Sequence, residues 1–213
     1  MNKAKNVVDF YVLCNKLKYV IRSGWINWGV KKDRLESVAE HIYGTQMLAI
    51  SMWSEFKYDI DIKKVLTMLA VHELEEIVIG DFTQFEIDKQ TKAEMGHKAV
   101  KQILSSLLSG KTIEDLILEF DERKSAEAKF AYECDKLECD IQSKLYDKEN
   151  CVDLTNQQSN KAYQDPEVQK LLASNKSWSE MWILFGQNHY NYDQNFLEVS
   201  NYALNNQIDT ETK

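Results

Sequence analysis

Apolar residues recur along most of the chain with a period near 3.6 residues, and few stretches alternate with a period of two. The first period is that of an amphipathic α-helix, and the second is typical of a β-strand. One proline and seven glycines leave few breaks. The pattern predicts an all-α protein with almost no strand. The helices are expected at about residues 4–22, 35–55, 62–77, 90–108, 112–121, 124–147, 165–174, 177–189 and 193–205.

Several predicted helices have residues at their ends that satisfy free backbone groups. Ser37 and Glu40 have the spacing of a capping box, in which a hydroxyl and a carboxylate bond to N–H groups of the first turn. Asp61 is a suitable N-cap, and Gly80 allows the chain to turn after the next helix. Thr112 precedes two acids, which favour a first helical turn. A helix that begins at Ser37 would carry the first histidine of the chain.

The composition predicts one folded domain. The chain has 213 residues, of which 44% are hydrophobic and 28% charged, as in ordinary globular proteins. We expect a helical bundle over residues 1–190, followed by a C-terminal helix and a disordered end within residues 191–213, where polar residues dominate.

Charge and cysteine usage exclude several classes of protein. A net charge of −8 argues against binding to a nucleic-acid polymer, so an anionic substrate would need a bound cation and a few well-placed basic side chains. No apolar stretch is long enough for a signal peptide or a membrane span. The four cysteines show no CxxC spacing, which predicts free thiols in the cytoplasm. Cys134 is expected to be a small buried hydrophobic residue.

His72 is followed within ten residues by four carboxylates, those of Glu73, Glu75, Glu76 and Asp81. Acids at the C-terminal end of a helix oppose its dipole and repel one another, a penalty that a bound cation would remove. The alternative is a solvated acidic face. On a continuous helix His72 and Glu76 would share a face, with Glu73 about 100° away. This arrangement favours the cation site.

A metal site around His72 needs ligands from elsewhere in the chain. Catalytic divalent sites use three or more protein groups and keep a position open. A zinc-protease HExxH motif is excluded because position 76 is Glu. His41 and Asp135 are available as further ligands.

The order of these residues resembles that of HD-domain metal-dependent phosphohydrolases, and most closely the branch that contains 5'-deoxynucleotidases. The resemblance rests on Glu36-Ser37-Val38-Ala39-Glu40-His41, His72-Glu73 with Glu76 and Asp81, and Ala126-Glu127-Ala128-Lys129 leading to Asp135-Lys136-Leu137-Glu138. Arg22-Ser23-Gly24-Trp25 also resembles that branch, so the similarity covers roughly residues 10–150. It implies an HD-domain helical bundle.

The resemblance also implies a metal site. His41, His72 and Asp135 correspond to three of the family's ligands, and Glu73 stands where the family has Asp. Its extra methylene moves the carboxylate by about 1 Å, although Glu remains a competent oxygen ligand. The expected cofactor is a divalent ion, with cobalt, manganese, magnesium, zinc, iron and nickel left open.

The remaining site residues are implied in the same way. Glu76 and Asp81 match family acids that handle the attacking water and the phosphate. Arg22 would add charge toward the phosphate, and Trp25 or Trp28 would stack on a base or line the pocket. The reaction expected is release of phosphate from a small phosphomonoester, such as a (deoxy)nucleoside 5'-monophosphate, without a covalent intermediate.

Other interpretations stay open. Glu94 and His97 form a Glu-x-x-His pair, the spacing that di-iron bundles use twice, but it occurs once here. His189 is expected to be structural. Glu73 keeps open a catalytically weakened HD domain that senses nucleotides or binds a partner. A homodimer is the expected assembly.

Overall fold

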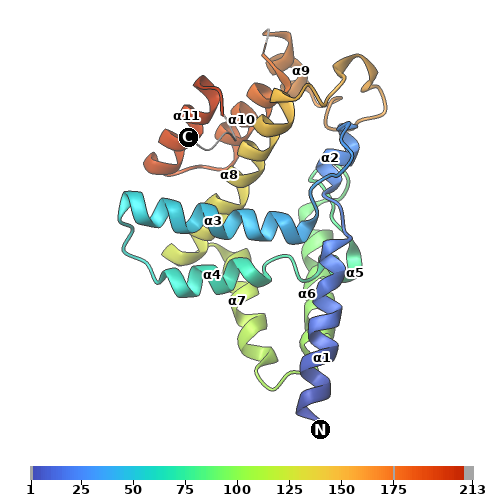
Figure 1. Ribbon diagram of the computed structural model, residues 1–213, viewed down its shortest axis with the longest axis vertical. Coiled ribbons are helices and arrows are strands. Elements are labelled where there is room, and N and C mark those ends of the chain that lie inside the picture. The colour runs from blue at the N-terminus through green and yellow to red at the C-terminus, as the bar shows by residue number, and fades with distance from the viewer. Residues whose placement is uncertain (1, 175, 209–213) are drawn as a thin grey trace.

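The computed structural model describes residues 2–174 and 176–208. Its helices are α1 (Lys3–Cys14), η1 (Asn15–Lys18), α2 (Ser23–Asn27), α3 (Val38–Phe56), α4 (Ile62–Val71), α5 (Glu76–Ile79), α6 (Lys89–Leu104), α7 (Gly110–Glu122), α8 (Ala126–Lys148), η2 (Leu154–Asn156), α9 (Pro166–Ala173), α10 (Trp178–His189) and α11 (Gln194–Asn205) (Figure 1). Over the described ranges the only β-type pairing is an isolated antiparallel bridge between Ile21 and Ser37. The predicted all-α fold is confirmed.

The helix α8 lies at the centre of the fold. It packs against α3, α4, α7, α10 and α11. Met68 and Leu69 from α4 and Leu137 from α8 are fully buried in the core that these helices share. Burial of apolar side chains stabilises the fold by about 25 cal/mol for each Å² removed from water. The packing of α3, α4 and α8 brings together the three segments that carry the predicted ligands.

Three predicted helix ends are confirmed. Ser37 and Glu40 form a capping box at the start of α3. The side chain of Asp61 accepts hydrogen bonds from the backbone N–H groups of Lys63 and Lys64 at the start of α4. Gly80 has a φ of +80°, a conformation that favours glycine, and it ends α5. The start of α3 is therefore fixed locally, close to the histidine that this helix carries.

The prediction of one helix over residues 62–77 is wrong at its end. The helix α4 ends at Val71, and α5 begins only at Glu76. Between them the backbone N–H groups of Leu74 and Glu76 bond to carbonyls three residues earlier, as in a 3₁₀ turn. Residues three apart then lie above one another, so Glu73 and Glu76 share a face, and the predicted shared face of His72 and Glu76 is lost.

The first predicted helix, over residues 4–22, is also too long. It ends at Cys14 and continues only as the short η1, after which the chain is extended. The backbone N–H of Arg22 donates to the carbonyl of Glu36 over 3.1 Å. This hydrogen bond holds Arg22 beside the start of α3. The short α2 that follows was not predicted, because five residues without a side-chain cap give no helical period.

The start of α7 differs from the prediction, and the predicted division of the C-terminal part is not tested. The helix predicted from Thr112 begins at Gly110, so its first turn contains no acid. The division of the chain at residue 190 stays a prediction; α11 packs on α8 and α10 and buries Phe196 completely. The predicted disordered end falls partly on residues 209–213, which lie outside the described residues.

The cysteines match expectation. All four cysteines are free thiols, and Cys134 is fully buried as expected. In the described part of the chain, no helix combines the length and the apolar character needed to cross a bilayer.

Candidate metal centre

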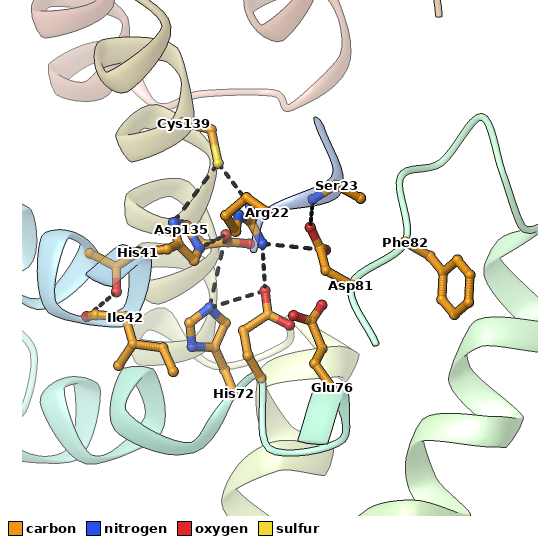
Figure 2. A network of polar contacts seen from close by, with 12 residues as sticks. Arg22, Ser23, His41, Ile42, His72, Glu76, Asp81, Phe82, Asp135 and Cys139 are labelled. Carbon is orange, nitrogen blue, oxygen red and sulfur yellow. Dashed lines mark hydrogen bonds and ion pairs between the residues drawn. The ribbon is translucent and has the colours of Figure 1, made fainter. Parts of the chain in front are cut away.

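Four side chains predicted as ligands converge in the interior. His41 comes from α3, His72 and Glu73 follow α4, and Asp135 comes from α8. One donor atom from each lies within 4.8 Å of the donor atoms of the others, and all four residues are buried. Figure 2 shows His41, His72 and Asp135 directed toward one another. These separations suit ligands around one ion with bond lengths of about 2.0–2.6 Å.

The imidazole of His72 is oriented by the backbone. Its Nδ1 lies 2.8 Å from the carbonyl oxygen of Leu69 and can only donate to it, which leaves the lone pair on Nε2. That Nε2 atom is buried and has no hydrogen-bond partner among the described residues. It lies 3.7 Å from Oε1 of Glu73 and 3.9 Å from Oδ1 of Asp135. A buried nitrogen with a free lone pair beside two carboxylates fits a metal ligand.

The imidazole of His41 is oriented by a carboxylate. Its Nδ1 lies 2.6 Å from Oε2 of Glu138, and its Nε2 lies 3.1 Å from Oδ1 of Asp135. Donation from Nδ1 to a carboxylate fixes the tautomer in which Nε2 is the ligand atom. Gly44 leaves room for this contact, because a Cβ there would lie 2.4 Å from Oε1 of Glu138. Glu138 is therefore built into the site behind His41.

Both predicted carboxylate ligands favour the ionised form. Although burial alone would raise it, the pKa of Asp135 is held well below its ordinary value by the charge of Lys136 and by a hydrogen bond from Nε2 of His41, whose proton a bound ion would displace. Burial likewise opposes ionisation of Glu73, but the nearby positive charges of Lys92 and Arg22 lower its pKa. Two imidazole nitrogens and two carboxylates form a donor set that suits a divalent ion.

A second group of possible ligands overlaps the first. His41, Glu138 and Cys139 also lie within 4.8 Å of one another through their donor atoms. In that group Nδ1 of His41 is already bonded to Glu138, and the sulfur of Cys139 accepts a hydrogen bond from Arg22 over 3.1 Å. The four-residue cluster, with the unpartnered nitrogen of His72, is the better candidate.

Arg22 links the cluster to Asp81. Its Nη1 lies 3.5 Å from Oε1 of Glu73 and 3.5 Å from Oδ1 of Asp81. The backbone N–H of Ser23 donates to the other oxygen of Asp81 over 2.5 Å. Burial opposes ionisation of Asp81, but Arg22 and this N–H lower its pKa to about 2. Asp81 therefore fixes Arg22 beside the predicted ligands.

Glu76 lies next to this group and is almost completely buried. Burial and the charges of Glu73 and Asp81 raise the pKa of Glu76 well above its ordinary value. The ammonium group of Lys92, from α6, lies 3.3 Å from Oε1 of Glu76. Glu76 and Glu73 are thus buried, as is most of Glu75, and the solvated acidic face is excluded.

Three residues of the site were missed at the sequence level: Lys92, Lys136 and Glu138. Lys136 lies 2.8 Å from Oδ2 of Asp135. Glu138 follows Asp135 by one helical turn, so the spacing on α8 could have indicated that both face the same side. Lys92 had no such signal, because α6 meets the site only through tertiary packing.

Trp25 lies in the core. Its indole N–H donates to Glu36 over 2.7 Å, its ring packs against Trp182 at 4.9 Å between centroids, and only 1% of its surface is exposed. The residue lines a cavity of about 600 Å³ that Arg22 and Glu73 also line. A ring so fully covered can form a wall but has no free face on which a base could stack.

The remaining histidines lie outside the cluster. His97 is exposed and lies 2.7 Å from Asp121, and neither His97 nor Glu94 belongs to a group of possible metal ligands among the described residues, which argues against a di-iron site. His189 lies 2.8 Å from Glu167 and is held against Phe185, as expected for a structural residue.

Comparisons with known proteins identify relatives of this chain. The HD domain family matches residues 14–178. The 5'-deoxynucleotidase HDDC2 of Dictyostelium discoideum is 34% identical over 152 residues, which cover 68% of this chain and 79% of that protein. The 5'-deoxynucleotidase hdd1 of Schizosaccharomyces pombe is 31% identical, with 70% and 77% covered.

A solved structure supports the fold independently. A protein from Pyrococcus horikoshii superimposes with a TM-score of 0.62 at 20% identity, over 92% of this chain and 98% of that one. The family match spans the residues that carry His41, the pair His72 and Glu73, and Asp135. The chain therefore belongs to the HD-domain family of phosphohydrolases.

Proposed function

We propose that this chain is a metal-dependent phosphohydrolase that releases phosphate from a (deoxy)nucleoside 5'-monophosphate. The names of its relatives, 5'-deoxynucleotidases, support this substrate class. A cavity of about 600 Å³ beside the cluster is within the usual size range for small-molecule sites. The proposed ligands are His41, His72, Glu73 and Asp135, and the ion is one of cobalt, manganese, magnesium, zinc, iron or nickel.

The observation that carries this proposal is the state of His72. Its buried Nε2 has no partner among the described residues and faces two carboxylates that favour ionisation. A buried polar atom without a partner costs free energy, about 1–3 kcal/mol, unless something binds it. A divalent ion would satisfy this nitrogen and would supply Lewis acidity toward water and a phosphoryl group.

The other side chains have separate tasks. Glu76 is a buried carboxyl beside Lys92, and it would orient the attacking water and take its proton. Arg22 would bind phosphate oxygens, and its contact with Asp81 keeps the guanidinium in place. Trp25 would form part of the cavity wall.

The second candidate is a weakened HD domain that binds nucleotides without turnover. Its support is Glu73, where the family has Asp. The distance of 3.7 Å between Oε1 of Glu73 and Nε2 of His72 favours the enzyme, because the longer side chain still reaches the cluster.

A screen of phosphate release would test the proposal. Nucleoside and deoxynucleoside 5'-monophosphates would be incubated with the metal-stripped protein and with Co²⁺, Mn²⁺, Mg²⁺ or Zn²⁺. We expect release that depends on metal and that a chelator abolishes. If no metal gives release but a nucleotide still binds, the second candidate replaces the first.

We also propose a homodimer in the cytoplasm. Tyr43, Met47, Ile50 and Trp53 form an exposed apolar stripe along α3, which supports a second copy as a partner. The free cysteines support a reducing compartment. Light scattering of the purified protein should give twice the mass of one chain. The Trp53→Lys variant should have the mass of a single chain.

A further inference from the structure

The cavity beside the predicted ligands has an aromatic side. Phe85 lies between α5 and α6, and Trp182 and Phe185 come from α10; all three line the cavity. Trp182 and Phe185 are three residues apart on one helix and so lie on the same face. We call these three residues the aromatic wall. Trp182 and Phe185 lie beyond residues 14–178, the range that the HD domain family matches.

The aromatic wall is held in place by its neighbours. The ring of His189 stacks on Phe185 with centroids 4.2 Å apart and an interplanar angle of 25°. His189 in turn lies 2.8 Å from the carboxylate of Glu167 on α9. One face of the Phe185 ring is thus covered, and a planar ligand can stack only on the other face.

The aromatic wall lies beside the phosphate end of the cavity. A Cβ on Gly24 would lie 3.3 Å from the ring of Trp182, so the ring rests on the backbone at this residue. Arg22, two residues earlier, also lines the cavity and contacts the predicted ligand Glu73. A nucleotide carries a charged phosphate and an aromatic base on one sugar, and the cavity offers a charged surface and an aromatic surface next to each other.

We propose that the aromatic wall is the base-binding surface of the substrate site and that the base stacks on Phe185. This inference rests on the proposed function, because it assumes that phosphate binds near Arg22. Stacking on aromatic rings tolerates any base, since every base has a π-face. The aromatic wall therefore selects for a nucleotide over a sugar phosphate and discriminates weakly among bases.

Phe85 has room to adjust to a bound base. Its ring centroid lies 6.0 Å from that of Phe185, whereas a base between two rings needs about 7–8 Å, or two carbon contact distances. Phe85 also lines a neighbouring cavity of about 370 Å³. A shift of about 1–2 Å toward that space would admit the base.

Substitution of Phe185 tests this proposal. We would compare 2'-deoxyadenosine 5'-monophosphate with 2-deoxyribose 5-phosphate, which has the phosphate and the sugar but no base. Phe185→Ala should lower kcat/KM for the nucleotide by about 5- to 150-fold, the range for loss of one aromatic stacking contact. The value for the sugar phosphate should not change. Phe185→Leu keeps an apolar side chain and should give part of the loss.

The control is Leu184→Ala, a truncation at the preceding position of α10, where the side chain lines neither of the two cavities. Leu184→Ala should leave kcat/KM for both substrates unchanged. Equal loss for the two substrates in Phe185→Ala, or no loss for either, would overturn the base-binding surface. Absence of turnover in the wild type would count against the proposed function. The same variants would then be compared by calorimetric binding of the two compounds, where only a selective loss of nucleotide affinity supports the aromatic wall.

Discussion

Glu138→Gln tests whether the carboxylate behind His41 positions a metal ligand. The change keeps the shape of the side chain, so it still fits the space that Gly44 leaves. It replaces a charged acceptor by a neutral one in the contact with Nδ1 of His41, which is 2.6 Å long and buried. The amide can also present its NH₂ group, which would favour the wrong tautomer of His41.

The expected loss follows from this contact. A hydrogen bond to a charged group contributes about 1.5–3 kcal/mol and a neutral one about 0.5–1.5 kcal/mol, so the difference is about 1–1.5 kcal/mol. This corresponds to a metal dissociation constant that is about 5- to 13-fold higher. Replacement of a residue that orients a metal-bound histidine typically lowers metal affinity by about 10- to 100-fold, so the loss is expected in the upper part of the range of about 5- to 13-fold.

The assay is calorimetric titration of the metal-stripped protein with Mn²⁺ or Co²⁺. The matched control is Glu133→Gln, also on α8, whose carboxylate accepts from the backbone N–H of Asp193 instead. Glu133→Gln should bind metal as the wild type does. If Glu138→Gln also binds metal with unchanged affinity, while a change at Glu73 weakens binding, Glu138 does not position His41.

Gly44→Ala should reproduce the effect through packing alone. A Cβ at this position would lie 2.4 Å from Oε1 of Glu138 and would displace the carboxylate from His41. Alanine is a better helix former than glycine by about 1 kcal/mol, so helix propensity cannot explain a loss. Weaker metal binding with retained helix content, measured by circular dichroism, is the expected result, and unchanged binding would contradict it.

Three further predictions concern the site and its surroundings. Glu73→Ala should weaken metal binding and abolish phosphate release, whereas Glu73→Asp should keep the ion and retain or raise turnover; unchanged metal affinity of Glu73→Ala in calorimetry would contradict ligation by this residue. Glu76→Gln should lower kcat by about 100-fold or more with nearly intact metal content, because it removes a proton acceptor; a parallel loss of metal would instead make it a ligand. Burial raises the pKa of Glu133 to about 7, so its contribution to stability is complete below about 4.5 and is lost as the pH rises through 7. The melting temperature of Glu133→Gln should therefore rise relative to that of the wild type between these pH values. A difference that does not change with pH would refute the raised pKa of Glu133.

The parts of the fold that the sequence predicted are governed by local interactions. The capping box of Ser37 and the N-cap of Asp61 involve residues within four positions, so their spacing is visible in the sequence. The end of α4 was missed because the turn after Val71 replaces i→i−4 bonds by i→i−3 bonds. The two patterns differ by only about 20° in the rotation from one residue to the next. The apolar pattern of four residues is too short to show this difference in the sequence.

The candidate site shows the same division. The ordered motifs predicted that His41, His72, Glu73 and Asp135 would meet, and the structure brings their donor atoms within 4.8 Å. Ligation itself stays a prediction. Lys92 could not be found, because its contact with the site depends on how α6 packs after the chain has folded. The aromatic wall depends in the same way on the position of α10 against the loop before α6.

The distribution of charge accounts for how an acidic chain can bind an anionic substrate. The net charge is −8, yet the cavity is lined by more basic than acidic side chains. The basic residues are Arg22, Lys89, Lys92, Arg123 and Lys136, and the acidic ones are Glu73 and Asp81. Both acids contact Arg22, which compensates half of their charge, and the other four basic side chains leave a local positive field in a concave site. A divalent ion held by the buried cluster would add to this positive field, and a phosphate dianion would then enter a cavity whose charge is complementary to its own.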